Sequence, residues 1–197
     1  MISALVHADR AVFEFLNGLA GHFVLLDDLI RGLANDYFLV IGFCLVLIAL
    51  WFGTRDAVQR KINQMAVITA AISLGIGQAI VDILNVFYFR PRPFTLLPTH
   101  LLFYAPHDSS FPSNAATIAF AVAFGVFFIN RKAGVWLLAM AAVLSLARVY
   151  VGVHYPSDIL GGATLACVTA WVISVIVRNR RVWVQRLLSF LEQFELA

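Results

Sequence analysis

Residues 133–177 decide the fold, and they read AGVWLLAMAAVLSLARVYVGVHYPSDILGGATLACVTAWVISVIV. Two apolar runs, 133–153 and 158–177, stand on either side of a short polar turn. A helix needs about 20 predominantly apolar residues to cross the hydrocarbon core of a bilayer, and each run is close to that length. The stretch therefore predicts two membrane helices joined at one membrane face.

The composition of the whole chain agrees with a membrane protein. Of the 197 residues, 61% are hydrophobic and 13% are charged, and the mean hydropathy is +0.88. A soluble domain normally carries about 25% charged residues. Cys44 and Cys167 lie inside apolar runs and are interpreted as packing residues. The formal net charge of +3 gives no reason to expect a nucleic-acid partner.

Three further apolar spans precede residues 133–177. The five predicted spans are 37–53, 64–89, 114–130, 133–153 and 158–177. They predict an all-α fold: a polytopic membrane helical bundle with about five transmembrane helices. Residues 1–197 would form one domain, with a transmembrane core at 37–178 and an amphipathic cytoplasmic tail at 179–197. The sequence leaves the oligomeric state open.

Residues 1–36 precede the first span and mix charged and apolar positions at helical spacing. They predict two interfacial helices, at 3–20 and 23–34. On the first, one face would contact lipid and the other water: Val12, Phe13, Leu16 and Leu19 against Asp9, Arg10, Glu14 and Asn17. On the second, Asp27, Asp28 and Arg31 would face water.

The basic residues predict the orientation in the membrane. They cluster between spans one and two, between spans three and four, and after span five, that is, at 55–61, 131–132 and 178–186. Cytoplasmic segments carry an excess of Lys and Arg, so these three clusters are placed in the cytoplasm. The loop 90–112, which holds five of the six prolines, and the turn at 154–157 would then face outward.

Three polar stretches meet on that outer side. They are Arg90-Pro91-Arg92-Pro93, Ser110-Phe111-Pro112-Ser113-Asn114-Ala115, and the segment from Arg148 through His154 to Asp158. Ionisable residues at membrane depth are costly and usually functional. The edges of otherwise apolar spans are therefore the predicted place of a functional site.

These residue types suit phosphoryl transfer. Arg92 and Arg148 can hold phosphate oxygens with bidentate guanidinium groups. A neutral His154 imidazole can attack phosphorus, and Asp158, one helical turn on, can hold its other ring nitrogen. Ser113 opens a helix whose amides form an anion site. Each residue also has a plain structural explanation, since arginines snorkel and Ser and Asp cap helices.

The three stretches resemble the type-2 phosphatidic acid phosphatase superfamily, which also includes vanadium haloperoxidases. The family pattern is Lys-x6-Arg-Pro, then Pro-Ser-Gly-His, then Ser-Arg-x5-His-x3-Asp. In this chain Arg92-Pro93, Pro112-Ser113 and Arg148…His154…Asp158 match at the same spacing. The third motif is highly specific, whereas the first alone would be weak.

The resemblance implies a helical bundle that works without a metal or other cofactor. His154 would be the nucleophile and Asp158 its orienting partner, while Arg92, Ser113 and Arg148 would bind phosphate. The Phe-Arg-Pro-Arg-Pro-Phe run at 89–94 is most similar to the bacterial bacitracin-resistance branch. That branch hydrolyses undecaprenyl pyrophosphate on the outer side of the plasma membrane and recycles the carrier lipid of cell-wall peptidoglycan.

The chain departs from the family pattern at four positions. Asn85 stands at the lysine position, Asn114 at the glycine position and Ala147 at the serine position. The amides of Asn85 and Asn114 could still donate to phosphate. Ala115 stands where the family has the histidine that protonates the leaving group, and alanine cannot transfer a proton. Two explanations remain open: an engineered inactive variant and a natural pseudoenzyme.

Several functions fit these residues. The first is hydrolysis of a lipid pyrophosphate through a phosphohistidine, impaired in this chain by Ala115. Other substrates of the same chemistry are phosphatidylglycerol phosphate and phosphatidic acid. A protein of another class would bind or translocate a polyprenyl or phospholipid phosphate without catalysis. His107 is interpreted as a loop residue, and Asp82 as either a partner of a site arginine or a wet-face residue.

Overall fold

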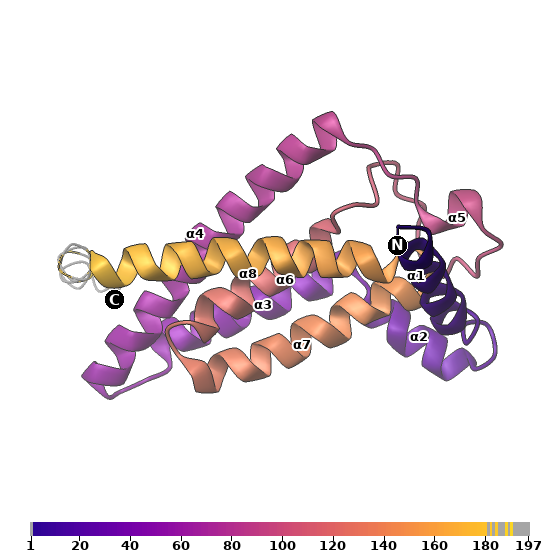
Figure 1. Cartoon of the computed structure of the whole chain (residues 1–197). Helices are drawn as coiled ribbons and strands as arrows, with labels where there is room; N and C mark the ends of the chain where they lie inside the picture. The colour runs from indigo at the N-terminus through magenta and orange to yellow at the C-terminus, as the bar shows by residue number, and fades with distance from the viewer. Residues whose placement is uncertain (1, 181, 183, 185–187, 189, 191–197) are drawn as a thin grey trace.

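The structure is a computed structural model that describes residues 2–180, 182, 184, 188 and 190. These residues form helices and loops without a β-strand, which confirms the predicted all-α fold (Figure 1). The helices are α1 (Ile2–Asn17), α2 (Val24–Leu33), α3 (Asp36–Phe52), α4 (Ala57–Phe87), α5 (Pro93–Leu96), α6 (Asn114–Phe127), α7 (Arg131–Tyr150) and α8 (Pro156–Asn179). The predicted tail at 179–197 lies largely outside the described residues.

A helix stands at each of the five predicted spans, but the helices differ in length. Within the described residues, α4, α7 and α8 are long and apolar enough to cross a membrane. α2 and α3 add a fourth span if the pair, bent by 51° at its break, crosses as one. α6 has 14 residues, which at about 1.5 Å per residue covers only about 21 Å. The fourteen-residue α6 is thus shorter than the predicted span 114–130.

Other helices surround α6. It packs against α3, α4, α7 and α8, and its buried face is rich in alanine. Small residues let helices approach closely in membrane bundles. At Gly125 the approach to α4 is close, because an added Cβ would lie 2.5 Å from the Cα of Ala70. A larger side chain at position 125 would force α4 and α6 apart.

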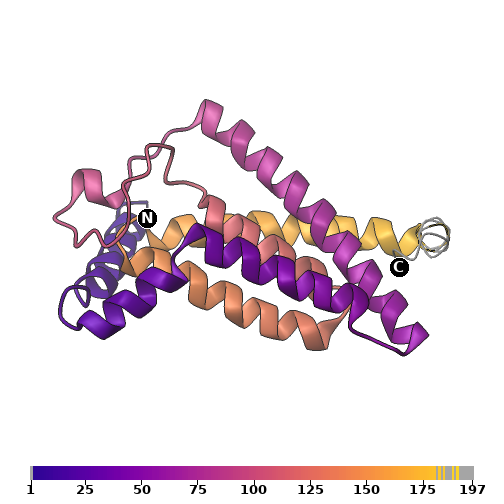
Figure 2. The ribbon, with the colours of Figure 1, turned by 180° about the vertical axis from the view of Figure 1, so that it is seen from behind.

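The two ends of the bundle differ in charge and in content. The α3–α4 turn, the α6–α7 turn and the C-terminal end of α8 lie at one end, and α1, α2 and the loop 88–113 lie at the other (Figure 1). The first two basic clusters and the described part of the third, Arg178 and Arg180, therefore share one end. Figure 2 shows the C-terminal half of α4 diverging from the other helices as it approaches the loop.

The N-terminal helices dock on the bundle, and the predicted division of their faces is wrong at Phe13, Asn17 and Asp27. Phe13 is buried and its ring lies 5.5 Å from that of Tyr155. Asn17 is also buried, and its Nδ2 donates to the carbonyls of His100 at 2.9 Å and Tyr150 at 2.8 Å. Asp27 on α2 is buried and accepts from the Tyr150 hydroxyl at 2.7 Å. Helical periodicity cannot distinguish a protein surface from lipid or water, so these polar residues were assigned to the wrong environment.

Candidate active site

A pocket of about 170 Å³ opens at the end of the bundle that carries α1, α2 and the long loop. Its walls come from the start of α3, the loop 97–113, the start of α6, the end of α7 and the turn before α8. The lining residues are Asp36, Arg92, Tyr104, Pro106, Asp108, Asn114, Ala115, Arg148 and His154. Five predicted site residues therefore meet here, although they are spread over 63 positions of sequence from 92 to 154.

His154 lies in the turn between α7 and α8 and is 3% exposed. Its Nδ1 is 3.0 Å from the Ser110 carbonyl, and its Nε2 is 3.3 Å from Nη1 of Arg92. A carbonyl only accepts, so Nδ1 carries the hydrogen and Nε2 keeps its lone pair. Burial lowers the pKa of this imidazole; Asp158 partly offsets the effect and the Arg92 charge adds to it. His154 is thus a neutral ring whose unprotonated Nε2 accepts a hydrogen bond from Arg92.

Asp158 forms hydrogen bonds with residues around His154 rather than with the imidazole ring. Its Oδ2 is 3.7 Å from Nδ1 of His154, too far for a hydrogen bond. That oxygen accepts from the Ser110 hydroxyl at 2.5 Å and from the Tyr155 amide at 2.7 Å. Asp158 therefore caps α8 and fixes Ser110, whose carbonyl orients the imidazole. Ser110 is a contributor that the sequence patterns did not single out.

Arg90 and Asp9 extend this network, and sequence reasoning missed both roles. Arg90 donates to Asp158 at 2.5 Å and to Asp9 at 2.8 Å, and its guanidinium lies 4.4 Å from the centre of the Tyr155 ring. Asp9 on α1 also accepts from the Ser157 amide at 2.8 Å. The Arg-Pro-Arg-Pro run signalled two arginines, but nothing local distinguished the one that supports Asp158 from the one that enters the pocket.

Arg92 and Arg148 are the buried cations of the pocket, 5% and 4% exposed. Arg92 donates to the backbone carbonyls of Val153 at 2.9 Å and Asp108 at 3.1 Å. Arg148 lies over the Phe103 ring at 4.9 Å, and its Nε has no hydrogen-bond partner among the described residues. Guanidinium groups held in this way present a fixed array of donors to an anion.

The remaining predicted phosphate ligands are placed differently. Asn114 lines the pocket, whereas Ser113 and Asn85 do not. The Ser113 hydroxyl accepts from the Ala116 amide at 3.3 Å and caps α6. Asn85 lies in the last turn of α4, the end that diverges from the bundle, and its Oδ1 is buried without a partner in the described structure. Phosphate binding by Ser113 and Asn85 stays a prediction.

Ala115 occupies the first turn of α6 and lines the same pocket as His154 and Arg148. A side chain at this position is therefore directed toward the space where a bound phosphate would contact His154. The methyl group of alanine offers no proton to that space.

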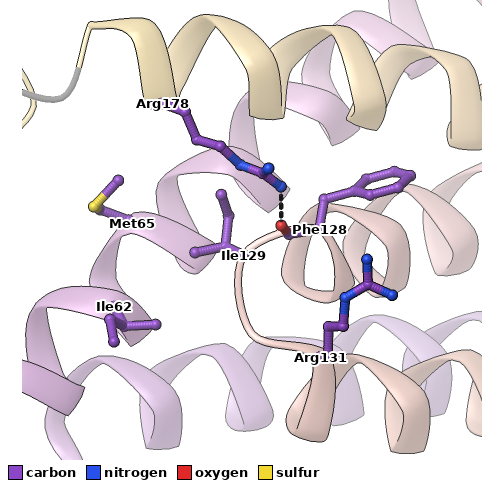
Figure 3. A pocket seen from close by; sticks show the side chains of 6 residues that line it. All are labelled: Ile62, Met65, Phe128, Ile129, Arg131 and Arg178. Atoms are coloured by element: carbon purple, nitrogen blue, oxygen red, sulfur yellow. Dashed lines mark hydrogen bonds between the residues drawn. The ribbon is translucent and has the colours of Figure 1, made fainter.

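A larger pocket of about 550 Å³ lies at the opposite, basic end of the bundle. Figure 3 shows its lining of Ile62, Met65, Phe128, Ile129, Arg131 and Arg178, in which Arg178 donates to the Phe128 carbonyl. These residues include no nucleophile and no acid. Volume alone therefore does not identify the reactive site, and the smaller pocket is the candidate active site because it holds the histidine and the two buried arginines.

Comparison with known proteins connects this geometry with a family. Residues 66–182 match the family model described as the PAP2 superfamily. The undecaprenyl-diphosphatase BcrC of Bacillus subtilis is 32% identical over 82% of this chain and 80% of its own length. The bacitracin transport permease protein BcrC of Bacillus licheniformis is 29% identical over 92% of this chain and 82% of its own length.

Solved structures agree with the fold. The crystal structure of Aquifex aeolicus LpxE superposes with a TM-score of 0.66 at 27% identity, covering 84% of this chain and 93% of that one. The PAP2-type phosphatidylglycerolphosphate phosphatase of Bacillus subtilis gives a TM-score of 0.62 at 19% identity, covering 89% and 87%. The family model spans Arg92, Arg148 and His154 of the pocket as well as Asp158. This multi-pass membrane chain belongs to the PAP2 superfamily.

Proposed function

We propose that this chain is a membrane lipid phosphatase whose preferred substrate is undecaprenyl pyrophosphate, released as undecaprenyl phosphate and inorganic phosphate. The unprotonated Nε2 of His154, which lies beside Arg92 in a pocket that Arg148 also lines, carries this proposal. The name of the Bacillus subtilis relative, an undecaprenyl-diphosphatase, supports the choice of lipid. Ala115 makes the chain an impaired form of the enzyme.

The reaction proceeds in two displacements at phosphorus. Nε2 of His154 attacks the terminal phosphorus, and the bond from that phosphorus to the bridging oxygen breaks, leaving undecaprenyl phosphate. Arg92 and Arg148 hold the charge on the equatorial oxygens. Water then attacks the phosphohistidine, the P–N bond breaks, and inorganic phosphate leaves with the lone pair returned to Nε2. A histidine at position 115 would supply the proton to the first leaving oxygen.

A substrate panel tests the proposal. The assay uses the Ala115→His protein in detergent micelles with EDTA present, where activity should persist because the proposed mechanism needs no divalent ion. Its kcat/KM should be highest for undecaprenyl pyrophosphate, because the leaving lipid phosphate is a stable anion. Phosphatidylglycerol phosphate and phosphatidic acid are the comparison substrates. A higher value for either would reassign the lipid. Activity lost in EDTA and restored by Mg²⁺ would contradict the metal-free mechanism.

Non-catalytic binding is the second candidate function, and Ala115 is the observation that favours it. The anion-binding residues are in place while the proton donor is missing. Binding of undecaprenyl pyrophosphate without turnover, by both the Ala115 chain and the Ala115→His variant, would support this alternative and exclude the phosphatase.

We also propose that the pocket faces the outer side of a bacterial plasma membrane, because the basic clusters lie at the opposite end. Single cysteines replace the exposed residues His107 and Arg55 in a chain with Cys44→Ser and Cys167→Ser. In intact cells, an impermeant thiol reagent should label position 107 and leave position 55 unlabelled until the cells are lysed. The reverse pattern would invert the orientation.

A further inference from the structure

Two carboxylates occupy the donors of the phosphate pocket. Asp108 accepts from Nη2 of Arg92 at 2.8 Å through one oxygen and from Nδ2 of Asn114 at 3.2 Å through the other. Asp36 accepts from Nη2 of Arg148 through Oδ1 and from the Tyr104 hydroxyl at 2.9 Å through Oδ2. Each carboxylate therefore spans two donors with its two oxygens, as two oxygens of a phosphate group would.

The four ionic side chains differ in their freedom to move. The side chains of Arg92 and Arg148 are 6% and 4% exposed, whereas those of Asp108 and Asp36 are each 45% exposed. A buried arginine left without an anionic partner is costly. An aspartate can rotate into water at little cost when a phosphate replaces it, because its own hydration is regained and the arginine stays paired. The arginines are the fixed half of each pair and the carboxylates the movable half.

The charges of the pocket residues determine whether phosphate and the two carboxylates can bind the arginines together. The two arginines and two aspartates of the pocket have formal charges that cancel. A phosphate group on the same donors would stand beside two carboxylates, and like charges a few ångströms apart in a half-buried site repel each other. Carboxylate and phosphate therefore compete for Arg92 and Arg148.

From these contacts we propose that Asp36 and Asp108 are phosphate placeholders, which hold the arginine donors in position and are displaced when the substrate's phosphate binds. The inference rests on the proposed phosphate pocket and adds two specificity-determining residues to it. Tyr104 helps to hold Asp36, to which its hydroxyl donates. Burial, and then the hydrogen bond to Asp36, raise the pKa of the Tyr104 phenol, so the hydroxyl keeps its proton.

The placeholders also bear on product release. After the phosphohistidine is hydrolysed, inorganic phosphate sits on the two buried arginines. Return of Asp36 and Asp108 to their donors weakens the hold on that ion, whereas tight binding of the product would slow each turnover. The two aspartates thus lower the affinity of the pocket for phosphate and speed the release of the product.

Binding of inorganic phosphate tests the placeholders directly. Isothermal titration calorimetry on the full Ala115 chain would compare Asp36→Asn and Asp108→Asn with the unmodified pocket. Removing one competing charge is expected to lower the Kd for phosphate about tenfold in each variant, the size of one charge-assisted hydrogen bond. Asp28→Asn is the matched control, since Asp28 is exposed on α2 and absent from the pocket lining.

A kinetic measurement repeats the test in the Ala115→His background. There the inhibition constant of inorganic phosphate should fall about tenfold with Asp36→Asn or Asp108→Asn, as one competing charge-assisted contact is lost, and stay unchanged with Asp28→Asn. Asp36→Ser and Asp108→Ser give the same comparison with shorter side chains if an Asn variant folds poorly. An unchanged or weakened affinity for phosphate in both Asp36 and Asp108 variants would overturn the placeholders and leave the phosphatase proposal intact. Failure of every variant to bind phosphate would contradict the pocket itself.

Discussion

Replacing Ala115 by histidine is expected to raise kcat by about 10²–10⁴-fold, the usual contribution of general acid–base catalysis. Position 115 lines the pocket that holds His154 and Arg148, so an imidazole there can reach the oxygen that leaves phosphorus. The Kd for substrate should stay similar, because Arg92 and Arg148 are already present. Phosphate release and equilibrium binding, measured for both proteins on the same lipid, give the two quantities.

The gain should depend on the leaving group. A lipid phosphate leaving from a pyrophosphate is a stable anion and needs little protonation, whereas an alkoxide leaving from a monoester needs much more. The restored histidine should therefore help phosphatidic acid more than undecaprenyl pyrophosphate, although its activation of water in the second step would narrow the difference. Ala115→Gln is the matched control, of similar size but without an exchangeable proton of suitable pKa. Equal activity of the Ala, Gln and His forms would refute the acid assignment.

Removing the nucleophile should have the largest effect of all. In the Ala115→His protein, His154→Gln is expected to lower kcat by about 10⁴-fold or more, since no other group can form the covalent intermediate. Glutamine keeps polar atoms near the Ser110 carbonyl and Arg92, so the buried contacts are partly retained. Rapid acid-free quenching of a reaction with substrate labelled at the terminal phosphate should show an acid-labile phosphohistidine only when His154 is present.

The control for that experiment is His107→Gln, which changes the exposed loop histidine outside the pocket lining. It should retain both full turnover and the labelled intermediate. Labelling that survives His154→Gln, or that disappears with His107→Gln, would move the nucleophile away from position 154.

Local features of the sequence were sufficient for the helices and for five of the residues that line the candidate site. Helix formation in a bilayer depends on apolar length and on satisfying the backbone within the segment, and both are properties of neighbouring residues. The Arg148, His154 and Asp158 spacing is equally local, because the end of α7 and the start of α8 lie within eleven residues, 148–158. The importance of position 115 came from the family pattern, which has a histidine where this chain has Ala115.

The tertiary structure alone decided which polar groups meet. It paired Arg90 with Asp158 and Asp9 across 68 and 81 positions of sequence. It brought Asp36 to Arg148 across 112 positions, and it left Ser113 and Asn85 outside the pocket lining. Periodicity records how apolar a helix face is but not whether lipid, water or another helix covers it, so the burial of Phe13 and Asn17 could not be foreseen. Contacts of this kind depend on how helices pack against one another, which the spacing of residues along one segment does not encode.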